Sequence, residues 1–231
     1  LAIGEHPRRE QDEGLRIGVI GLGTGTIAAL AQPKDTLRFY EINPLVIEFA
    51  ASPVALFTYL HDSAAKNVEV VQGDARIQLE RELALDDRQQ FDVLAVDAFS
   101  SDSIPMHLLT LECAELYFEH LKPNGILALH ISNRHLDLEP VVQALAEQLG
   151  VQAVQVNNKD QSSIGVDSSD WVLLTSNEQF LGSESLQKHG RKWSAETQPS
   201  VLWTDDYGSL WQVLRKPELP ALFTLFAGDD E

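Results

Sequence analysis

The feature that most constrains this chain is residues 16–26, RIGVIGLGTGT, where an apolar run leads directly into three closely spaced glycines. The run 17–20 is typical of a buried strand, and the Ala-rich stretch 27–31 is typical of a helix. Glycines at such a junction let the backbone approach a ligand closely, and a helix N-terminus offers free N–H groups to it. The segment therefore predicts a cradle for a nucleoside cofactor.

The spacing of the glycines distinguishes between classes of cofactor. A dinucleotide fingerprint reads G-x-G-x-x-G, whereas this turn has Gly21, Gly23 and then Thr26 in place of the third glycine. The third glycine is instead Gly25, and G-x-G-x-G after a first strand is more typical of adenosylmethionine-type cofactors, which have no pyrophosphate. Glu41 follows Gly21 by twenty residues and ends a second strand-like run, a spacing that suits two ribose hydroxyls.

Strand-like and helix-like segments alternate along most of the chain. This alternation predicts an α/β fold with a doubly wound, mostly parallel, seven-stranded Rossmann-like sheet. Because right-handed crossovers bring the ends of parallel strands to one edge, groups that follow the first four strands should share one crevice. The expected strands are 16–20, 36–40, 68–72, 91–96, 125–131, 151–156 and 171–175, and the expected helices are 26–31, 44–57, 75–85, 108–120 and 138–150.

Two further carboxylates follow strands at this edge. Asp74, in the triplet Gly73-Asp74-Ala75, can accept a hydrogen bond from an adenine amino group, and it can also cap the next helix. Asp97 ends the fourth strand, a position at which an acid can also be a cap or a turn residue. The glycine turn, Glu41, Asp74 and Asp97 follow the first four strands in the right order. Together they indicate a nucleoside site much more specifically than any one of them does alone.

The charge of the chain narrows the class of partner. There are 35 Asp and Glu against 17 Lys and Arg, a net charge of −18 without a basic patch, which disfavours nucleic acid. Acidic clefts concentrate cations, so a small cationic partner is favoured, although the charge also keeps a chain dissolved. The single Cys113 excludes an internal disulfide and a cysteine-based metal site, and we expect no metal. No run of 18 apolar residues is present, so we expect no membrane span.

On these residues the sequence resembles the spermidine synthase family, polyamine aminopropyltransferases built on the class I methyltransferase fold. It is most similar to the spermidine synthase-like domains that occur alone or behind membrane-embedded segments in bacteria. The resemblance implies a lead-in at 1–15 left from a longer chain, a catalytic domain at 16–176, and an extension at 177–231 that packs on the same domain. The motifs that carry it are IGLGTGT, FYEINP, VVQGDAR, FDVLAVDAFSSDSIPMHLLT, LKPNGILALHISNR and WTDDYGSL.

The resemblance also implies a role for individual residues of the crevice. Glu41 would bind the ribose hydroxyls of the donor, and Asp74 with the backbone of Ala75 would hold the adenine. The residues implied to bind the donor are Gly21, Gly23, Thr24, Gly25, Glu41, Asp74 and Ala75.

The proposed catalytic groups come from the loop after the fourth strand. Asp97 matches the first Asp of the family's D-S-S-D-P loop, whose carboxylate takes a proton from the attacking amine, and Asp102 stands for the second Asp. A polyamine is protonated at neutral pH, so a carboxylate that attracts it and accepts its proton suits this chemistry.

Two polar clusters are candidates for the acceptor side. Asp205, Asp206 and Tyr207 form an acidic-aromatic set suited to a cationic amine, and the alternative is a cap for a helix at 207–214. A second cluster follows the fifth strand and either lines the acceptor pocket or is a polar loop. Its members are His130, Ser132, Asn133 and His135.

The sequence departs from the family's pattern at several positions, which leaves the choice between aminopropyl and methyl transfer open. Thr24 occupies the Asp position of the family's G-G-G-D-G turn and removes a counter-charge for the donor's amine. The loop D-A-F-S-S-D-S-I-P is longer than D-S-S-D-P, and the family's N-terminal β-hairpin region has no counterpart in these residues.

The preferred hypothesis is transfer of an aminopropyl group from decarboxylated S-adenosylmethionine to a putrescine-type amine. The alternatives are a methyltransferase that uses S-adenosylmethionine and a non-catalytic domain that binds an adenosyl ligand. We expect a small amine as partner, no nucleic acid and no membrane contact by this chain itself. Attachment to a membrane segment and a homodimer are left open. The expected location is cytoplasmic, including the cytoplasmic part of a membrane-anchored protein.

Overall fold

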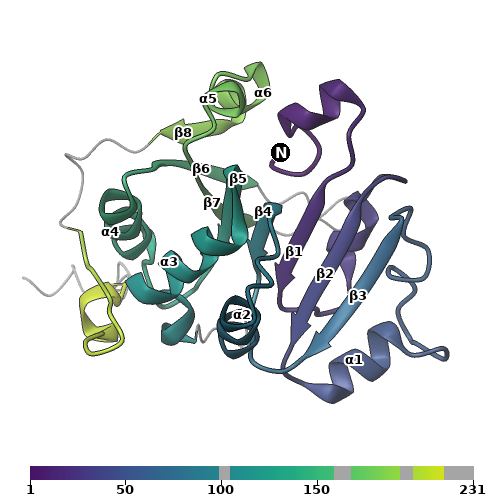
Figure 1. Ribbon diagram of the computed structural model, residues 1–231. Coiled ribbons are helices and arrows are strands. Elements are labelled where there is room, and N and C mark those ends of the chain that lie inside the picture. Colours follow the sequence, from purple (N-terminus) through teal and green to yellow (C-terminus); the bar gives the residue numbers. More distant parts are fainter. Residues whose placement is uncertain (99–104, 159–167, 193–199, 216–231) are drawn as a thin grey trace, which may run out of the picture.

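The computed structural model describes residues 1–98, 105–158, 168–192 and 200–215, and their strands form one eight-stranded sheet (Figure 1). The strand order is β3-β2-β1-β4-β5-β7-β6-β8, parallel from β3 to β5 and antiparallel from β5 to β8. The strands are β1 (Arg16–Ile20), β2 (Thr36–Glu41), β3 (Asn67–Gln72), β4 (Phe91–Val96), β5 (Leu121–His130), β6 (Gln152–Asn158), β7 (Ser169–Thr175) and β8 (Gly190–Lys192).

Helices cover both faces of the sheet. The α-helices are α1 (Pro44–Ala51), α2 (Ala75–Ala84), α3 (Leu111–His120), α4 (Glu139–Leu149), α5 (Glu178–Leu181) and α6 (Glu184–His189). The 3₁₀-helices are η1 (Pro7–Gln11), η2 (Thr26–Leu30), η3 (Met106–Leu108) and η5 (Leu210–Val213). Among the described residues, no helix has the length and apolar character needed to cross a membrane.

Alternation along the strands divides the core into two layers. In β1, Ile17 and Val19 pack with Ala50 of α1, whereas Ile20 packs with Leu79 of α2 on the other side. The layer beside Leu79 also takes in α3 and α4. Every residue of β4 is buried, as expected for a central strand covered on both faces.

Several expected elements differ in extent from the observed ones. The helix expected at 44–57 ends at Ala51, because Ser52 precedes Pro53, and a residue before proline disfavours helical geometry. The helix expected at 108–120 is divided into η3 and α3, with the Thr110 side chain capping α3. The helix considered at 207–214 is only the short η5. The eighth strand, β8, lies in the extension and was not expected from the sequence.

The glycine turn does not lead into an α-helix. The five residues of η2 form a 3₁₀-helix that begins after Gly25 and is followed by Gln32-Pro33. A segment this short has no helix N-terminal site for an anion. The helix expected at 26–31 is therefore present as a short 3₁₀-helix and not as an α-helix.

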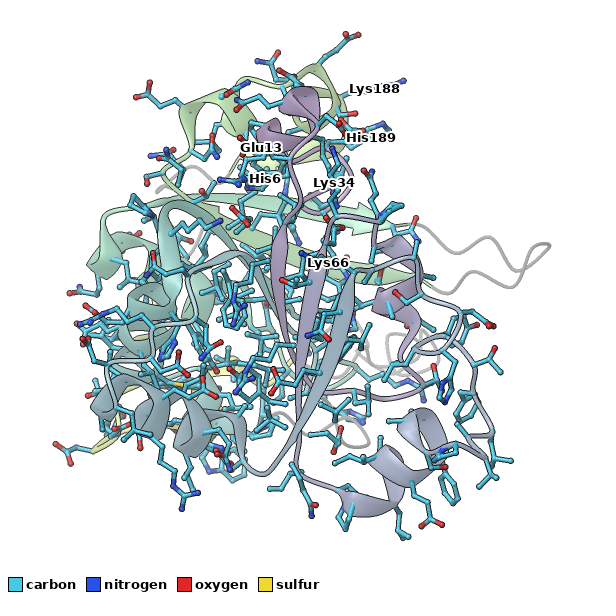
Figure 2. The ribbon with its side chains drawn as sticks, turned by 45° about the vertical axis from the view of Figure 1, so that its right-hand side comes forward. His6, Glu13, Lys34, Lys66, Lys188 and His189 are labelled. Carbon is cyan, nitrogen blue, oxygen red and sulfur yellow. The ribbon has the colours of Figure 1, made fainter. Side chains whose placement is uncertain are left out.

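The lead-in, residues 1–15, is bound at the end of the sheet opposite α1 (Figure 1). Figure 2 shows its His6 and Glu13 at the same end as Lys34 and as His189 of α6. Arg9 donates to both carboxylate oxygens of the fully buried Asp35, at 2.6 and 2.7 Å. The extension also contributes to the core, since its Trp203 is fully buried.

Candidate active site

The glycine turn brings the ends of β1, β2 and β4 into contact. Gly21 has φ +94°, and a Cβ at this position would lie 2.3 Å from the carbonyl oxygen of Asp97. Its N–H donates to the carbonyl of Tyr40 at 2.9 Å. Gly23 has φ +52° and no atom within 4 Å of an added Cβ, so its exposed face is open to a ligand. Gly25 has φ +86° and packs under Leu60, which leaves no room for a side chain.

A cavity of about 360 Å³ opens at these strand ends. Its lining contains groups from four successive crossovers, as the topology requires. The sequence-predicted residues that the structure brings together here are Gly21, Gly23, Glu41, Asp74, Ala75 and Asp97. A wider and more polar hollow lies around Asp92 and Lys122, but it holds none of the sequence-predicted residues, and its lysine is paired with Asp92.

Glu41, the last residue of β2, is held rigidly in the cavity wall. Its Oε2 accepts from the N–H of Leu22 at 3.0 Å, and its Oε1 accepts from the N–H of Asn43 at 2.7 Å. The residue is 9% exposed. Each oxygen keeps a further lone pair, so the carboxylate is still able to accept from the two hydroxyls of a ribose.

Asp74 both caps a helix and lines the cavity. Its Oδ1 caps α2 by accepting from the N–H of Ile77 at 3.1 Å, and the residue also lines the cavity. Its Oδ2 lies 3.1 Å from Nε2 of His107, which lines the cavity from η3. His107 lies in the motif FDVLAVDAFSSDSIPMHLLT, but spacing alone does not predict its contact with Asp74, because only the fold brings η3 over the start of α2.

Asp97 is the first residue after β4, and its N–H donates to the carbonyl of Ile20 at 2.8 Å. Its side chain is 34% exposed and lies at the cavity, with Oδ1 at 2.8 Å from Nδ1 of His130. The His130 ring stacks on Trp171 at a centroid distance of 4.7 Å, and its Nε2 lies 2.7 Å from Oγ of Ser132. Two members of the polar cluster after β5 therefore join the proposed catalytic carboxylate.

The acidic-aromatic set lies outside the cavity. Asp205 forms an ion pair with Arg76 of α2, at 2.7 Å between Oδ1 and Nη1, and it accepts from Oγ1 of Thr110 at 2.9 Å. The Arg76 guanidinium, helped by Thr110, holds the pKa of the Asp205 carboxyl below its usual value. Asp206 and Tyr207 are exposed. Their role in amine binding stays a prediction.

Two other sequence-predicted residues, Thr24 and Gly25, also lie away from the described lining. Thr24 is half-buried and Gly25 is buried, and neither lines the cavity. Asp102 lies outside the described residues.

The cavity is acidic. Glu41, Asp74 and Asp97 line it, and the described lining contains neither Lys nor Arg. Such a wall favours a cationic ligand over an anionic one. No group of three or more His, Cys, Asp or Glu side chains is arranged to hold a metal ion in the described part of the chain.

This chain is similar in sequence to a known protein and in fold to several solved structures. No family model matches the chain. A polyamine aminopropyltransferase of Vibrio vulnificus is 28% identical over 198 residues, which cover 84% of this chain and 61% of that protein. The chain thus spans about three fifths of the length of this curated relative. The resemblance expected from the motifs is confirmed by this similarity.

Solved structures confirm the fold. Spermidine synthase from Thermotoga maritima superposes with a TM-score of 0.57 at 14% identity, covering 89% of this chain and 65% of that one. Human methyltransferase-like protein 13 in complex with SAH superposes with a TM-score of 0.56 at 17% identity, covering 84% of this chain and 91% of that one. The chain has the doubly wound fold that spermidine synthases share with class I methyltransferases.

Proposed function

We propose that this chain is a spermidine synthase-like transferase that moves an aminopropyl group from decarboxylated S-adenosylmethionine to a small amine of the putrescine type. The observation that carries the proposal is the cavity at the strand ends, where three carboxylates and a glycine turn meet without a described Lys or Arg. The similarity to a polyamine aminopropyltransferase supports it. We assign the catalytic domain to residues 16–176 and propose that it acts in the cytoplasm.

The cavity matches the parts of such a donor. Glu41 accepts from the ribose hydroxyls, and Asp74 accepts from the adenine amino group beside the backbone of Ala75. The sulfonium and the amine of the donor are cations, which suit an acidic wall. The turn Gly21–Gly25 gives the donor's chain a close approach to the backbone, mainly over the open face of Gly23.

The absence of Lys and Arg from the described lining favours the decarboxylated donor over S-adenosylmethionine itself. The carboxylate of S-adenosylmethionine would add a fourth negative charge to a cavity lined by Glu41, Asp74 and Asp97, without a described Lys or Arg to offset it. The loop 99–104, which lies outside the described residues, reads FSSDSI and contains no basic residue either. Decarboxylation removes that repulsion, because like charges in a partly buried site disfavour each other.

The chemistry assigned to Asp97 is a proton transfer. An ammonium group of the amine gives its proton to the Asp97 carboxylate, and the freed nitrogen attacks the methylene carbon bonded to the sulfonium. A C–N bond forms and the C–S bond breaks, so the electron pair stays on sulfur and methylthioadenosine leaves as a neutral product. We assign Asp102 to the second acid of the same loop.

A second candidate function is methyl transfer from S-adenosylmethionine to an acceptor not identified. Two observations favour it: Thr24 stands where the family has the acid for the donor's amine, and the fold matches 91% of a methyltransferase chain. Isothermal titration calorimetry with decarboxylated S-adenosylmethionine, S-adenosylmethionine, methylthioadenosine and S-adenosylhomocysteine separates the two functions. We expect the decarboxylated donor and methylthioadenosine to bind. Binding of only S-adenosylmethionine and its homocysteine product would overturn the aminopropyl proposal in favour of methyl transfer.

Replacement of Asp97 tests the catalytic assignment. Asp97→Asn keeps the shape of the side chain but not its basicity, so we expect kcat for spermidine formation from putrescine to fall about 100- to 10,000-fold. Methylthioadenosine should still bind. Mass spectrometry of the products gives the rate, and Asp62→Asn, at an exposed position outside the cavity lining, is the matched control. Unchanged turnover in Asp97→Asn would show that another group takes the proton.

A further inference from the structure

The carboxylate of Asp97 lies beside a chain of polar groups that connects it to the backbone of β7. Nδ1 of His130 lies 2.8 Å from Oδ1 of Asp97, and Nε2 lies 2.7 Å from Oγ of Ser132. The same Oγ accepts from the N–H of Asp170 at 2.7 Å. These contacts join the ends of β4, β5 and β7, which are separated by more than thirty residues at each step.

The hydrogen-bonding capacity of these groups assigns the protons along the chain. A carboxylate accepts only, so His130 must present Nδ1–H to Asp97. A neutral imidazole carries one ring hydrogen, and Nε2 is then an acceptor. Ser132 is able to fill that need, because its oxygen accepts from Asp170 N–H while its own hydrogen is free to point at Nε2. Each contact thus has one donor and one acceptor.

The plane of the His130 ring is fixed by two strands. His130 ends β5 and pairs with Trp171 of β7 in antiparallel register, and the two rings are stacked with an interplanar angle of 9°. Just beyond, the N–H of Ile131 donates to the carbonyl of Asp170 at 2.8 Å. The sheet consequently holds the imidazole in place.

We propose that His130 is a positioning residue for Asp97, with Nδ1–H holding Oδ1 so that Oδ2 takes the proton of the acceptor amine. This inference rests on the proposed function, because it assigns a part in the same proton transfer. An acid at a strand end has rotamer freedom, and a fixed donor on one oxygen restricts the other to the orientation that the reaction uses. Ser132 and Trp171 fix the tautomer and the ring.

Two amide replacements separate the two ring nitrogens of His130. In His130→Asn the amide nitrogen lies near the place of Nδ1, and in His130→Gln it lies near the place of Nε2. We expect His130→Gln to lower kcat for aminopropyl transfer about 10- to 100-fold, as for loss of one hydrogen bond to a charged group, and His130→Asn to retain most of it. Affinity for methylthioadenosine should be unchanged in both variants. Equal losses in the two variants, or a loss matched by weaker methylthioadenosine binding, would overturn the positioning role.

A spectroscopic measurement tests the contact without turnover. ¹⁵N NMR of the full chain without ligand should show the His130 ring protonated on Nδ1, and Asp97→Ala should remove this preference. A ring protonated on Nε2 in the wild type would overturn the proposal. A wild type that transfers no aminopropyl group, yet shows the Nδ1–H tautomer, would overturn the proposed function while leaving the Asp97–His130 contact established.

Discussion

At the scale of single residues, the cavity proposed to bind the donor depends on carboxylates that the backbone holds in place. Glu41 is the clearest case, because two N–H groups fix its oxygens before any ligand arrives. Glu41→Gln places an amide donor against one of those N–H groups and removes the charge. We expect the Kd for methylthioadenosine to rise about 10- to 100-fold, measured by calorimetry.

The matched control for Glu41→Gln is Glu48→Gln, which removes the same charge from an exposed position of α1 outside the cavity lining. Its affinity for methylthioadenosine should equal that of the wild type. Equal affinities of the two variants for this ligand would mean that Glu41 is a structural acid and that the ribose site is elsewhere.

The two glycines Gly21 and Gly23 differ in why they are needed. Gly21→Ala puts a methyl group within 2.3 Å of the Asp97 carbonyl at a positive φ, so β1 and β4 must separate. Gly23→Ala carries only the cost of its positive φ, about 1–2 kcal/mol, because no atom lies within 4 Å. Urea unfolding should therefore show a larger loss of stability for Gly21→Ala. The reverse order would show that the turn relaxes independently of β4.

At the scale of elements, the ion pair between Asp205 and Arg76 ties the extension to the first turn of α2. The contact joins positions 129 residues apart and lies next to Asp74 and Ala75 of the cavity. Glu112 of α3 accepts from the Asp205 N–H at 3.0 Å, so the segment is held from two helices. The extension therefore supports the wall in which the adenine is proposed to lie.

This ion pair predicts a pH dependence of stability. The Arg76 hydrogen bonds lower the folded-state pKa of Asp205 below the ordinary value of 3.8, so its stabilising effect is complete above that value. The effect is lost as the pH falls through the lowered folded-state pKa. Asp205→Asn should be less stable than the wild type near pH 7, and the difference should vanish in strong acid.

Urea unfolding across pH 2–7 measures this difference, and Asp206→Asn is the control because the neighbouring Asp206 is exposed and no ion pair of it is among the described contacts. A stability difference between the wild type and Asp205→Asn that persists unchanged to pH 2 would contradict the ion-pair explanation.

At the scale of the whole molecule, the two ends of the sheet differ in what they hold. The cavity occupies the end near α1, and the lead-in is anchored at the other end through Arg9 and Asp35 (Figure 1). The N–H groups of Leu15 and Gln32 also donate to Asp35, each at 2.8 Å. Burial alone would raise the pKa of Asp35, but these four donors lower it, so the carboxylate stays charged inside the protein.

Removing this buried acid should affect stability but not the cavity. Asp35→Ala leaves the Arg9 guanidinium largely buried without its partner, which costs about 3–5 kcal/mol. Asp12→Ala, at the exposed pair with Lys34, should cost about 0–1 kcal/mol. Urea unfolding gives both values. Weaker methylthioadenosine binding by Asp35→Ala at temperatures where it is folded would show that the two ends of the sheet are coupled.

What the sequence by itself determined is the sheet and the edge at which the site lies. The expected bounds of β1 and β4 are the observed ones, because buried parallel strands are continuous apolar runs between turn residues. Glu41, Asp74 and Asp97 line one cavity, because right-handed crossovers bring the ends of successive parallel strands to one edge of the sheet. This holds whatever the length of the helices that connect the strands.

Only the tertiary structure decided which polar groups meet. The pairing of Asp205 with Arg76 could not be predicted, since an ion pair between distant segments leaves no periodic signal in the chain. His130 meets Asp97 because β4 and β5 are neighbours in a register that spacing alone does not specify. The glycine turn remains the centre of the molecule, but the carboxylates around it, and not an α-helix that follows the turn, make up the polar wall.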